Sequence, residues 1–234
     1  MESVAPPHIA TAANGTAKPS AATLSRPPLR FPQAKHFVLA GLVLGVVVAA
    51  FFGDSSVDHF VRGHWNRGWI RVAGMVSKYG DLGYLLLVAL IIFVLGGIFR
   101  HRMATKLAIA LVLSSCLAGV VTTTIRSVTG RTRPSANVAQ GWYGIRHDSR
   151  WLVGKYQFNS FPSGHTGCAV GFAIPLFLGF RRGRILAVVF AAAVGWSRIY
   201  LGCHHLSDVI VAALIGIVVG LYAWHRLLPK LFRG

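Results

Sequence analysis

Three short polar clusters interrupt the apolar segments of this 234-residue chain. They contain arginines, serines, histidines and an aspartate, and they cover residues 126–134, 162–165 and 197–208. Arginine at membrane depth is costly unless an anion pairs with it, and too few carboxylates lie near Arg126, Arg133 and Arg198 to pair with all three. Because planar guanidinium groups match the oxygens of phosphate, we expect a bound phosphate group as their counter-charge.

Ser163 and Gly164 belong to a Pro-Ser-Gly-His sequence that precedes a run of apolar residues. We expect a helix to begin there, so that the Ser163 hydroxyl and the backbone N–H groups around Gly164 donate to the same anion. The residues also fit an ordinary helix start, in which proline and serine have capping roles.

The histidines supply groups for nucleophilic and acid–base chemistry. His204 and Asp208 are four residues apart, in what we expect to be the first turn of a helix, so they share a face. The carboxylate can accept the Nδ1 proton of His204, which leaves Nε2 free to attack. His205 lies three residues from Asp208, and the residues alone leave that alternative open. His165 has the pKa range needed to protonate a leaving oxygen and then to activate water.

The same residues do not form a pattern that binds a metal. No carboxylate cluster suits Mg²⁺, and three histidines in separate roles make a poor zinc set, so we predict a site without metal or cofactor. Each polar cluster taken alone could be a charged flank of a span or a structural hydrogen bond. The three clusters together, in complementary roles on one face, favour a catalytic site.

The composition indicates which elements position these residues. The chain is 54% hydrophobic and 13% charged, with a mean hydropathy of +0.57, whereas soluble domains have about 25% charged residues. We therefore predict an all-α, polytopic membrane protein with one domain over residues 35–234 and six transmembrane helices in a bundle. The expected spans are residues 37–53, 82–98, 106–125, 166–180, 185–200 and 206–224.

The positive charges predict the orientation of these spans. A net charge of +18 would suit a nucleic-acid-binding protein, but the basic residues lie between apolar spans rather than on one polar face, so we expect no nucleic acid partner. Basic residues crowd the short loops after the second, fourth and sixth spans, which predicts that both termini are cytoplasmic and that the three polar clusters face outside, in the cell (inner) membrane. These inside residues are Lys18, Arg26, Arg30, Lys35, Arg100, Arg102, Lys106, Arg181, Arg182, Arg184, Arg226, Lys230 and Arg233.

The remaining segments are a tail and two outer connectors. Residues 1–34 are rich in Ala, Pro, Ser and Thr, which predicts a disordered cytoplasmic tail that is retained. Residues 54–81 have an amphipathic pattern with tryptophans, typical of a helix on the bilayer surface that serves as a connector or as a lid. Residues 126–164 form a long basic and aromatic connector, a length that indicates function. The three cysteines form no disulfide framework and are interpreted as apolar filler: Cys116, Cys168 and Cys203.

With these residues in view, the chain resembles the phosphatidic acid phosphatase type 2 / haloperoxidase superfamily. The signature of that family is K-x6-R-P, then P-S-G-H, then S-R-x5-H-x3-D. The second and third parts match at every fixed position, and Arg133-Pro134 match the end of the first, in which Arg126 replaces the leading lysine. The match covers about residues 100–225, and its spacing selects His204 rather than His205.

The resemblance implies a role for each matched residue. His204 would be the nucleophile that forms a phosphohistidine, Asp208 would orient it, and His165 would be the acid and base. The groups expected to hold the phosphoryl oxygens are Arg126, Arg133, Ser163, Gly164 and Arg198. Arginine at position 126 keeps the charge of the family lysine but replaces a point donor by a fork, so Arg131 could share its contact.

We therefore expect an integral-membrane lipid phosphatase that hydrolyses a phosphomonoester or diphosphate at the outer leaflet. Undecaprenyl diphosphate, phosphatidylglycerol phosphate, phosphatidate and lipid A phosphates all present the same phosphoryl group, and the sequence does not distinguish them. A lipid phosphotransferase would use the same residues. A non-catalytic binder or transporter would need only the arginines, and a vanadium haloperoxidase is disfavoured by the six expected spans and the short chain.

Overall fold

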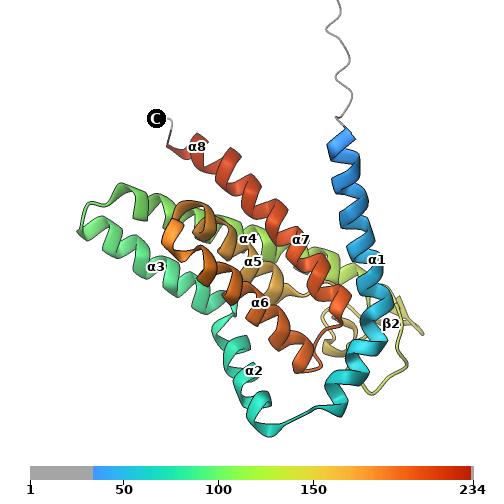
Figure 1. Ribbon diagram of the computed structural model, residues 1–234. Coiled ribbons are helices and arrows are strands. Elements are labelled where there is room, and N and C mark those ends of the chain that lie inside the picture. The colour runs from blue at the N-terminus through green and yellow to red at the C-terminus, as the bar shows by residue number, and fades with distance from the viewer. Residues whose placement is uncertain (1–33, 233–234) are drawn as a thin grey trace, which may run out of the picture.

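The computed structural model describes residues 34–232, which are mainly helical (Figure 1). The expected tail therefore lies outside the described residues, apart from its last position. The helices that correspond to the six expected spans are α1 (Ala34–Gly63), α3 (Leu82–Ile98), α4 (Arg102–Thr129), α5 (Gly164–Gly179), α6 (Arg184–Tyr200) and α7 (Leu206–Tyr222). The other elements are α2 (Arg67–Tyr79), β1 (Arg146–His147), β2 (Arg150–Trp151), η1 (Tyr156–Phe158), η2 (Arg181–Gly183), the π-helical turn η3 (Ala223–Leu227) and α8 (Leu228–Leu231).

Not all six helices have the length of a membrane span. Four of the described helical stretches are long and apolar enough to cross a bilayer, and α2 with α3 would make a fifth if this bent pair counts as one span. Helix α5 has 16 residues and therefore rises about 24 Å, less than the roughly 30 Å of hydrocarbon in a bilayer. Most of its residues are buried, because α4, α6 and α7 pack around it. Its neighbours, rather than lipid, provide its apolar surroundings.

The outer connector over residues 54–81 differs from the single surface helix expected. Helix α1 continues through this region to Gly63, and α2 begins after Asn66, whose side chain accepts a hydrogen bond of 2.7 Å from the Gly68 N–H. Helices α2 and α3 then meet at an angle of 54°. Asp81 ends this bend by capping α3, since its Oδ1 accepts from the Gly83 N–H at 3.0 Å. The tryptophan-bearing segment is thus the end of α1 followed by a separate amphipathic helix.

Small residues let the central helices approach closely. A Cβ added at Gly167 would lie 2.6 Å from Cγ2 of Thr122, and one at Gly171 would lie 2.8 Å from the Ser114 carbonyl oxygen. Gly167 therefore leaves room for a side chain of α4, and Gly171 leaves room for its backbone. Close approach through glycine is the usual way in which membrane helices gain packing contacts. It fixes α5 firmly between its neighbours.

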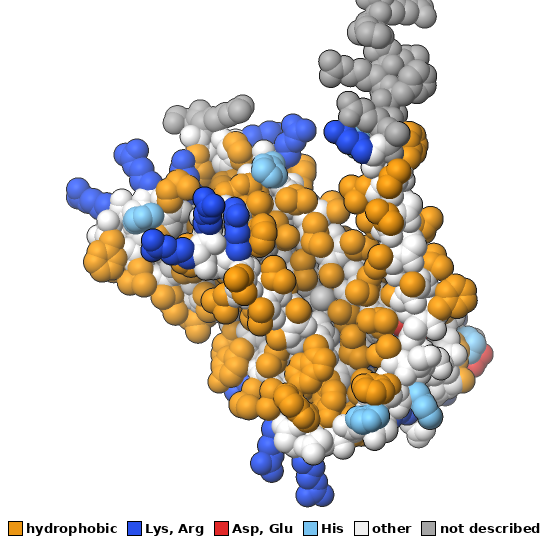
Figure 2. Space-filling view, viewed as in Figure 1, with side chains coloured by type: hydrophobic (Ala, Val, Ile, Leu, Met, Phe, Trp, Pro, Cys, Tyr) orange, Lys and Arg blue, Asp and Glu red, His pale blue; other side chains and the backbone are white. Residues whose placement is uncertain are grey.

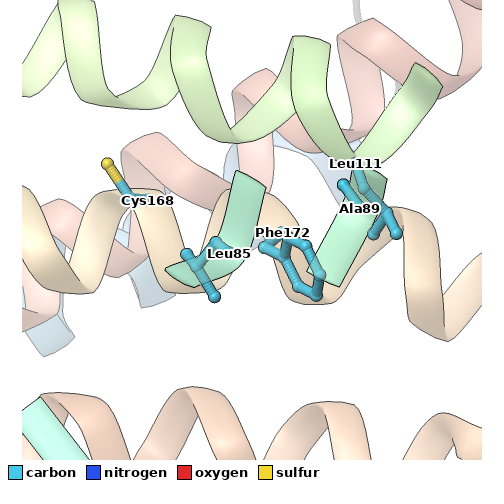
Figure 3. Packing of buried hydrophobic residues seen from close by; sticks show 5 residues of the cluster. All are labelled: Leu85, Ala89, Leu111, Cys168 and Phe172. Atoms are coloured by element: carbon cyan, nitrogen blue, oxygen red, sulfur yellow. The ribbon is translucent and has the colours of Figure 1, made fainter. Parts of the chain in front are cut away.

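A hydrophobic cluster joins three of the helices (Figure 3). Leu85 and Ala89 of α3, Leu111 of α4, and Cys168 and Phe172 of α5 are buried against one another. Cys168 serves here as a small apolar side chain, in agreement with the interpretation of the cysteines. The cluster holds α3 against α4 and α5, the two helices that adjoin the first and second polar clusters.

The surface has the pattern of a protein embedded in a bilayer. Figure 2 shows Lys and Arg side chains at two opposite ends of the molecule, with a broad hydrophobic surface between them. The N-terminal half of α1 leans away from the other helices in Figure 1 and is apolar on all sides, with Phe37 66% exposed and Leu42 64% exposed. Such surface is stable only in contact with lipid, and the chain is therefore a multi-pass helical membrane protein.

Candidate active site

Hydrogen bonds to backbone carbonyls bring the three polar clusters together. The Ser160 N–H donates to the carbonyl of Arg131 at 3.1 Å, and the Ser163 N–H donates to the carbonyl of Asp208 at 3.1 Å. The ring of His204 donates from Nδ1 to the carbonyl of Ser160 at 2.7 Å. The end of α4, the start of α5 and the loop before α7 therefore meet at one place, as the six-span arrangement predicts.

The start of α5 presents its backbone donors to this place. Ser163 is the N-cap, and its Oγ accepts from the Thr166 N–H at 3.4 Å and from the Thr166 hydroxyl at 3.0 Å. The N–H groups of the first helical turn, beginning with Gly164 and His165, have no partners within the helix. An anion beside them gains both these donors and the positive end of the helix dipole.

Gly164 allows the guanidinium group of Arg126 to approach this turn. A Cβ at position 164 would lie 2.9 Å from Nη1 of Arg126, closer than real contacts of this kind. The glycine of the Pro-Ser-Gly-His sequence thus leaves room for this guanidinium group, which a larger side chain would displace. It sets Arg126 directly against the helix start.

We expect Gly164→Ala to weaken the binding of inorganic phosphate by about 10-fold to 100-fold, because the new methyl group displaces Arg126 from the helix start. Titration calorimetry of the purified protein in detergent measures this loss. Gly74→Ala is the matched control, since a Cβ at that glycine of α2 meets nothing within 4 Å. Equal phosphate affinities of Gly164→Ala and wild type would mean that Arg126 does not hold the anion.

The three expected phosphate-binding arginines hold unused hydrogen-bond donors. Among the described residues, the buried side-chain nitrogen and oxygen atoms without a partner are Nε of Arg126, Nε and Nη1 of Arg133, and Nε of Arg198. All of them belong to these three arginines, whose guanidinium groups also lie close enough to repel one another. Buried donors are almost always satisfied in proteins, so a cluster of unpaired guanidinium nitrogens indicates an anion-binding site.

Each arginine is supported by a different element. Nη2 of Arg126 donates to the Thr123 hydroxyl at 3.3 Å, within α4. Arg133 stacks on the ring of Tyr156 in the long connector, with its Cζ 3.8 Å from the ring centroid. Nη1 of Arg198 donates to the Ser77 hydroxyl of α2. The long connector and the amphipathic helix thus have a positioning role that their sequences alone did not specify.

Arg131 does not join these arginines. Its Nη1 lies 2.5 Å from Oδ1 of Asp208, and its Nη2 lies 2.5 Å from Oδ2 of Asp54 in α1. Its guanidinium group also lies over the ring of Trp142, with Cζ 4.8 Å from the ring centroid. The suggestion that Arg131 shares the phosphate contact of Arg126 therefore does not fit the structure, in which Arg131 holds Asp208.

Sequence reasoning missed this buried ion-pair network. Asp54 is 7% exposed, and it also accepts hydrogen bonds from the N–H and the hydroxyl of Ser207, at 2.8 Å and 2.6 Å. The signal in the sequence was an aspartate directly after an apolar run, because a charge at the edge of a membrane helix requires a partner. Its partners, Arg131 and Ser207, could not be identified from spacing.

His204 lies in the loop before α7 rather than in the first helical turn, which begins at Leu206. Its Nδ1 proton goes to the Ser160 carbonyl, while Oδ2 of Asp208 lies 3.6 Å from the same nitrogen. The expected direct hydrogen bond to Asp208 is therefore replaced by a bond to a carbonyl, with the carboxylate alongside. Burial lowers the pKa of His204 to about 4, although Asp208 acts in the opposite direction. The ring is neutral at pH 7, and its Nε2 has a free lone pair.

His205 is engaged at both ring nitrogens. Its Nδ1 lies 2.8 Å from Oδ2 of Asp58, and its Nε2 lies 3.1 Å from the Thr132 carbonyl oxygen. Burial acts to lower the pKa of His205, but the hydrogen bond with Asp58 and the charge of Asp208 raise it overall. With both nitrogens donating, His205 has no lone pair for attack, which agrees with the selection of His204.

His165 faces a cavity of about 590 Å³ between α3, α4 and α5. Its Nε2 lies 3.3 Å from Oδ2 of Asp81, a partner that the sequence did not suggest. The cavity is polar near His165 and Arg126 and otherwise largely apolar. Its lining consists of Asp81, Leu82, Cys116, Gly119, Val120, Thr123, Thr124, Arg126, Gly164, His165 and Cys168.

Comparisons with known proteins agree with this arrangement. The family model of the PAP2 superfamily matches residues 107–231. The chain is 26% identical to a lipid A 1-phosphatase of Rhizobium johnstonii over 217 residues, which cover 88% of this chain and 82% of that protein.

Two solved structures share the fold. A PAP2-type phosphatidylglycerolphosphate phosphatase of Bacillus subtilis has a TM-score of 0.60 at 20% identity, covering 86% of this chain and 97% of that one. LpxE of Aquifex aeolicus has a TM-score of 0.53 at 24% identity, covering 73% and 94%. The resemblance carried by the three motifs is therefore confirmed: the chain belongs to the PAP2 superfamily and is a membrane phosphatase of that family.

Proposed function

We propose that this phosphatase hydrolyses a lipid phosphomonoester or diphosphate in two steps, through a phosphohistidine at His204 and without a metal ion. The observation that carries the proposal is the set of unpaired donors on Arg126, Arg133 and Arg198, the first of which lies against the start of α5. They supply the positive charge that phosphoryl transfer requires.

In the first step, Nε2 of His204 attacks phosphorus and the bond to the lipid oxygen breaks. His165 gives a proton to that oxygen, so the lipid leaves as an alcohol, or as a lipid monophosphate from a diphosphate. In the second step, His165 takes a proton from water, which attacks the same phosphorus and breaks the phosphorus–nitrogen bond. Inorganic phosphate leaves, and both histidines return to their initial states. Asp208, held by Arg131, stabilises the positive charge that develops on His204.

The surroundings of the site support a lipid as substrate. The cavity beside His165 opens among Leu82, Val120 and Cys168, so an apolar chain can lie next to a polar head. The Rhizobium relative is named for a lipid A phosphate and the Bacillus neighbour for phosphatidylglycerol phosphate. Among the candidate substrates named from the sequence, we therefore favour lipid A phosphates and phosphatidylglycerol phosphate over undecaprenyl diphosphate and phosphatidate.

The proposal includes six spans in the inner membrane, with both termini in the cytoplasm and the site outside. In Figure 1 the start of α1 and helix α8 lie at one end of the molecule, together with the α3–α4 turn. Arg100 and Arg102 belong to that turn, and the positive-inside rule places such residues in the cytoplasm. The short length of α5 is compatible with six crossings, because α4, α6 and α7 surround it and its ends need not reach the membrane surface.

A lipid panel tests the function. We expect the purified protein to release phosphate from at least one of lipid A, phosphatidylglycerol phosphate, phosphatidate and undecaprenyl diphosphate, at a rate unchanged by EDTA. Binding without release across the whole panel would favour a non-catalytic binder. Transfer of the phosphoryl group to an added acceptor lipid, in place of release, would favour a phosphotransferase.

The same assay in intact spheroplasts tests the orientation. A short-chain phosphatidate added outside should be hydrolysed without permeabilisation of the membrane. Hydrolysis that appears only after permeabilisation would place the site in the cytoplasm.

A further inference from the structure

We propose that Asp81, at the bend between α2 and α3, is a positioning residue that favours the protonated form of His165 and orients its ring for proton donation. This inference rests on the proposed function, since it assigns a partner to the proton donor of that reaction. Its basis is the 3.3 Å distance between Oδ2 of Asp81 and Nε2 of His165, and the place of both residues on the wall of one cavity.

The surroundings of His165 make such a partner necessary. The cations that act on its ring come from three elements: Arg126 from α4, Arg133 from the long connector and Arg198 from α6. These three positive charges disfavour a fourth on the imidazole ring, yet the ring must be the positively charged imidazolium in order to donate a proton. Asp81 is the carboxylate that faces the ring, and its negative charge offsets this repulsion.

The contact also determines which proton is transferred. A protonated histidine donates from two ring nitrogens, and here Nε2 donates to Asp81. The proton available for the leaving oxygen is therefore the one on Nδ1. After transfer, Nε2 of the neutral ring keeps its proton and still donates it to Asp81. Nδ1 is then unprotonated, and it takes a proton from water in the second step.

The local structure fixes the carboxylate in place. Oδ1 of Asp81 caps α3 by accepting from the Gly83 N–H at 3.0 Å, while Oδ2 faces His165. The cap removes the rotational freedom of the side chain, so the second oxygen is held in one position even though the side chain is 52% exposed. One side chain thus combines a structural contact with an electrostatic one, and a substitution can separate the two.

Asp81→Asn makes that separation, because asparagine caps helices as well as aspartate does but carries no charge. We expect kcat/KM for dihexanoyl phosphatidate, which has an alkoxide leaving group, to fall by about 10-fold to 100-fold. For p-nitrophenyl phosphate we expect a fall of less than about 3-fold, because that leaving group departs without a proton. The ratio of the two losses measures proton donation. A purely structural role of Asp81 would lower both rates equally and leave this ratio near one.

The chain offers a matched control. His147 and Asp148 form another pair at 3.3 Å, far more exposed, with the Asp148 side chain 85% exposed. Asp148→Asn removes a carboxylate from a histidine at the same distance but away from the cavity, and it should change neither rate. Asp81→Ser serves as a second variant that keeps a cap, in case Asp81→Asn is poorly folded.

The outcomes are distinct. Equal losses on both substrates in Asp81→Asn, or no loss on either, would overturn the role of Asp81 while leaving the proposed function intact. A wild-type protein inactive on both phosphates and on the lipid panel would overturn the proposed function, and with it the role of Asp81. A selective loss on dihexanoyl phosphatidate supports both.

Discussion

Replacing His204 by alanine is expected to reduce phosphate release from the lipid substrate by at least about 10³-fold, because it removes the nitrogen proposed to attack phosphorus. The Nε2 of His204 is unprotonated in the neutral ring, since Nδ1 holds the proton in its bond to Ser160. His205, its neighbour, has both nitrogens occupied by Asp58 and Thr132 and cannot substitute for it. The measurement is the initial rate of phosphate release in detergent.

A trapping experiment accompanies this rate. Brief reaction with a lipid labelled by ³²P at the phosphoryl group, followed by quenching in alkali, should leave label on the wild-type protein and none on His204→Ala. His147→Ala, which changes an exposed histidine of the connector, should keep both the label and the rate. Wild-type activity in His204→Ala would rule out the proposed nucleophile.

Of the substitutions proposed for this protein, Arg131→Met should lower the free energy of unfolding the most. Methionine keeps the length of the side chain but leaves Asp54 and Asp208 buried without their cation. Breaking a buried ion pair in this way costs about 3–5 kcal/mol of unfolding free energy. Thermal unfolding in detergent, followed by circular dichroism, should show a clearly lower Tm than that of the wild type.

Arg146→Met is the control for this substitution, because Arg146 is exposed in β1 and its loss should leave Tm nearly unchanged. A double variant, Arg131→Met with Asp54→Asn, should recover part of the loss, since it removes one of the two unpaired charges. A Tm of Arg131→Met equal to that of wild type would show that the network contributes no net stability.

The helices could be predicted because their signal is local. Each apolar run between basic loops is found as a helix, and the boundaries of α3 at residues 82–98 agree with the expected span. The exact number of spans could not be predicted from hydropathy, because α5 is short and is covered by protein. A hydropathy pattern does not distinguish a helix that faces lipid from one that faces other helices.

The residues proposed to react could be named from the sequence, because their spacing is fixed within each motif. Their supports could not, because these come from distant parts of the chain. Asp54 and Arg131 are 77 residues apart, and Ser77 and Arg198 are 121 residues apart. Asp81 directly precedes the apolar run at residues 82–98, and only the fold places its second oxygen beside His165.

The distance along the chain between Asp54 and its partners has a consequence for biosynthesis. Helix α1 emerges from the ribosome with Asp54 and Asp58 at its end, long before Arg131 and His205 are made. An unpaired carboxylate does not remain in hydrocarbon, so the end of α1 has to stay at the membrane surface while α2 to α6 are inserted. Only when the start of α7 has been translated can both aspartates be buried. The proposed nucleophile, His204, is therefore positioned in the final stage of assembly, and we expect a chain truncated before α7 to be inactive.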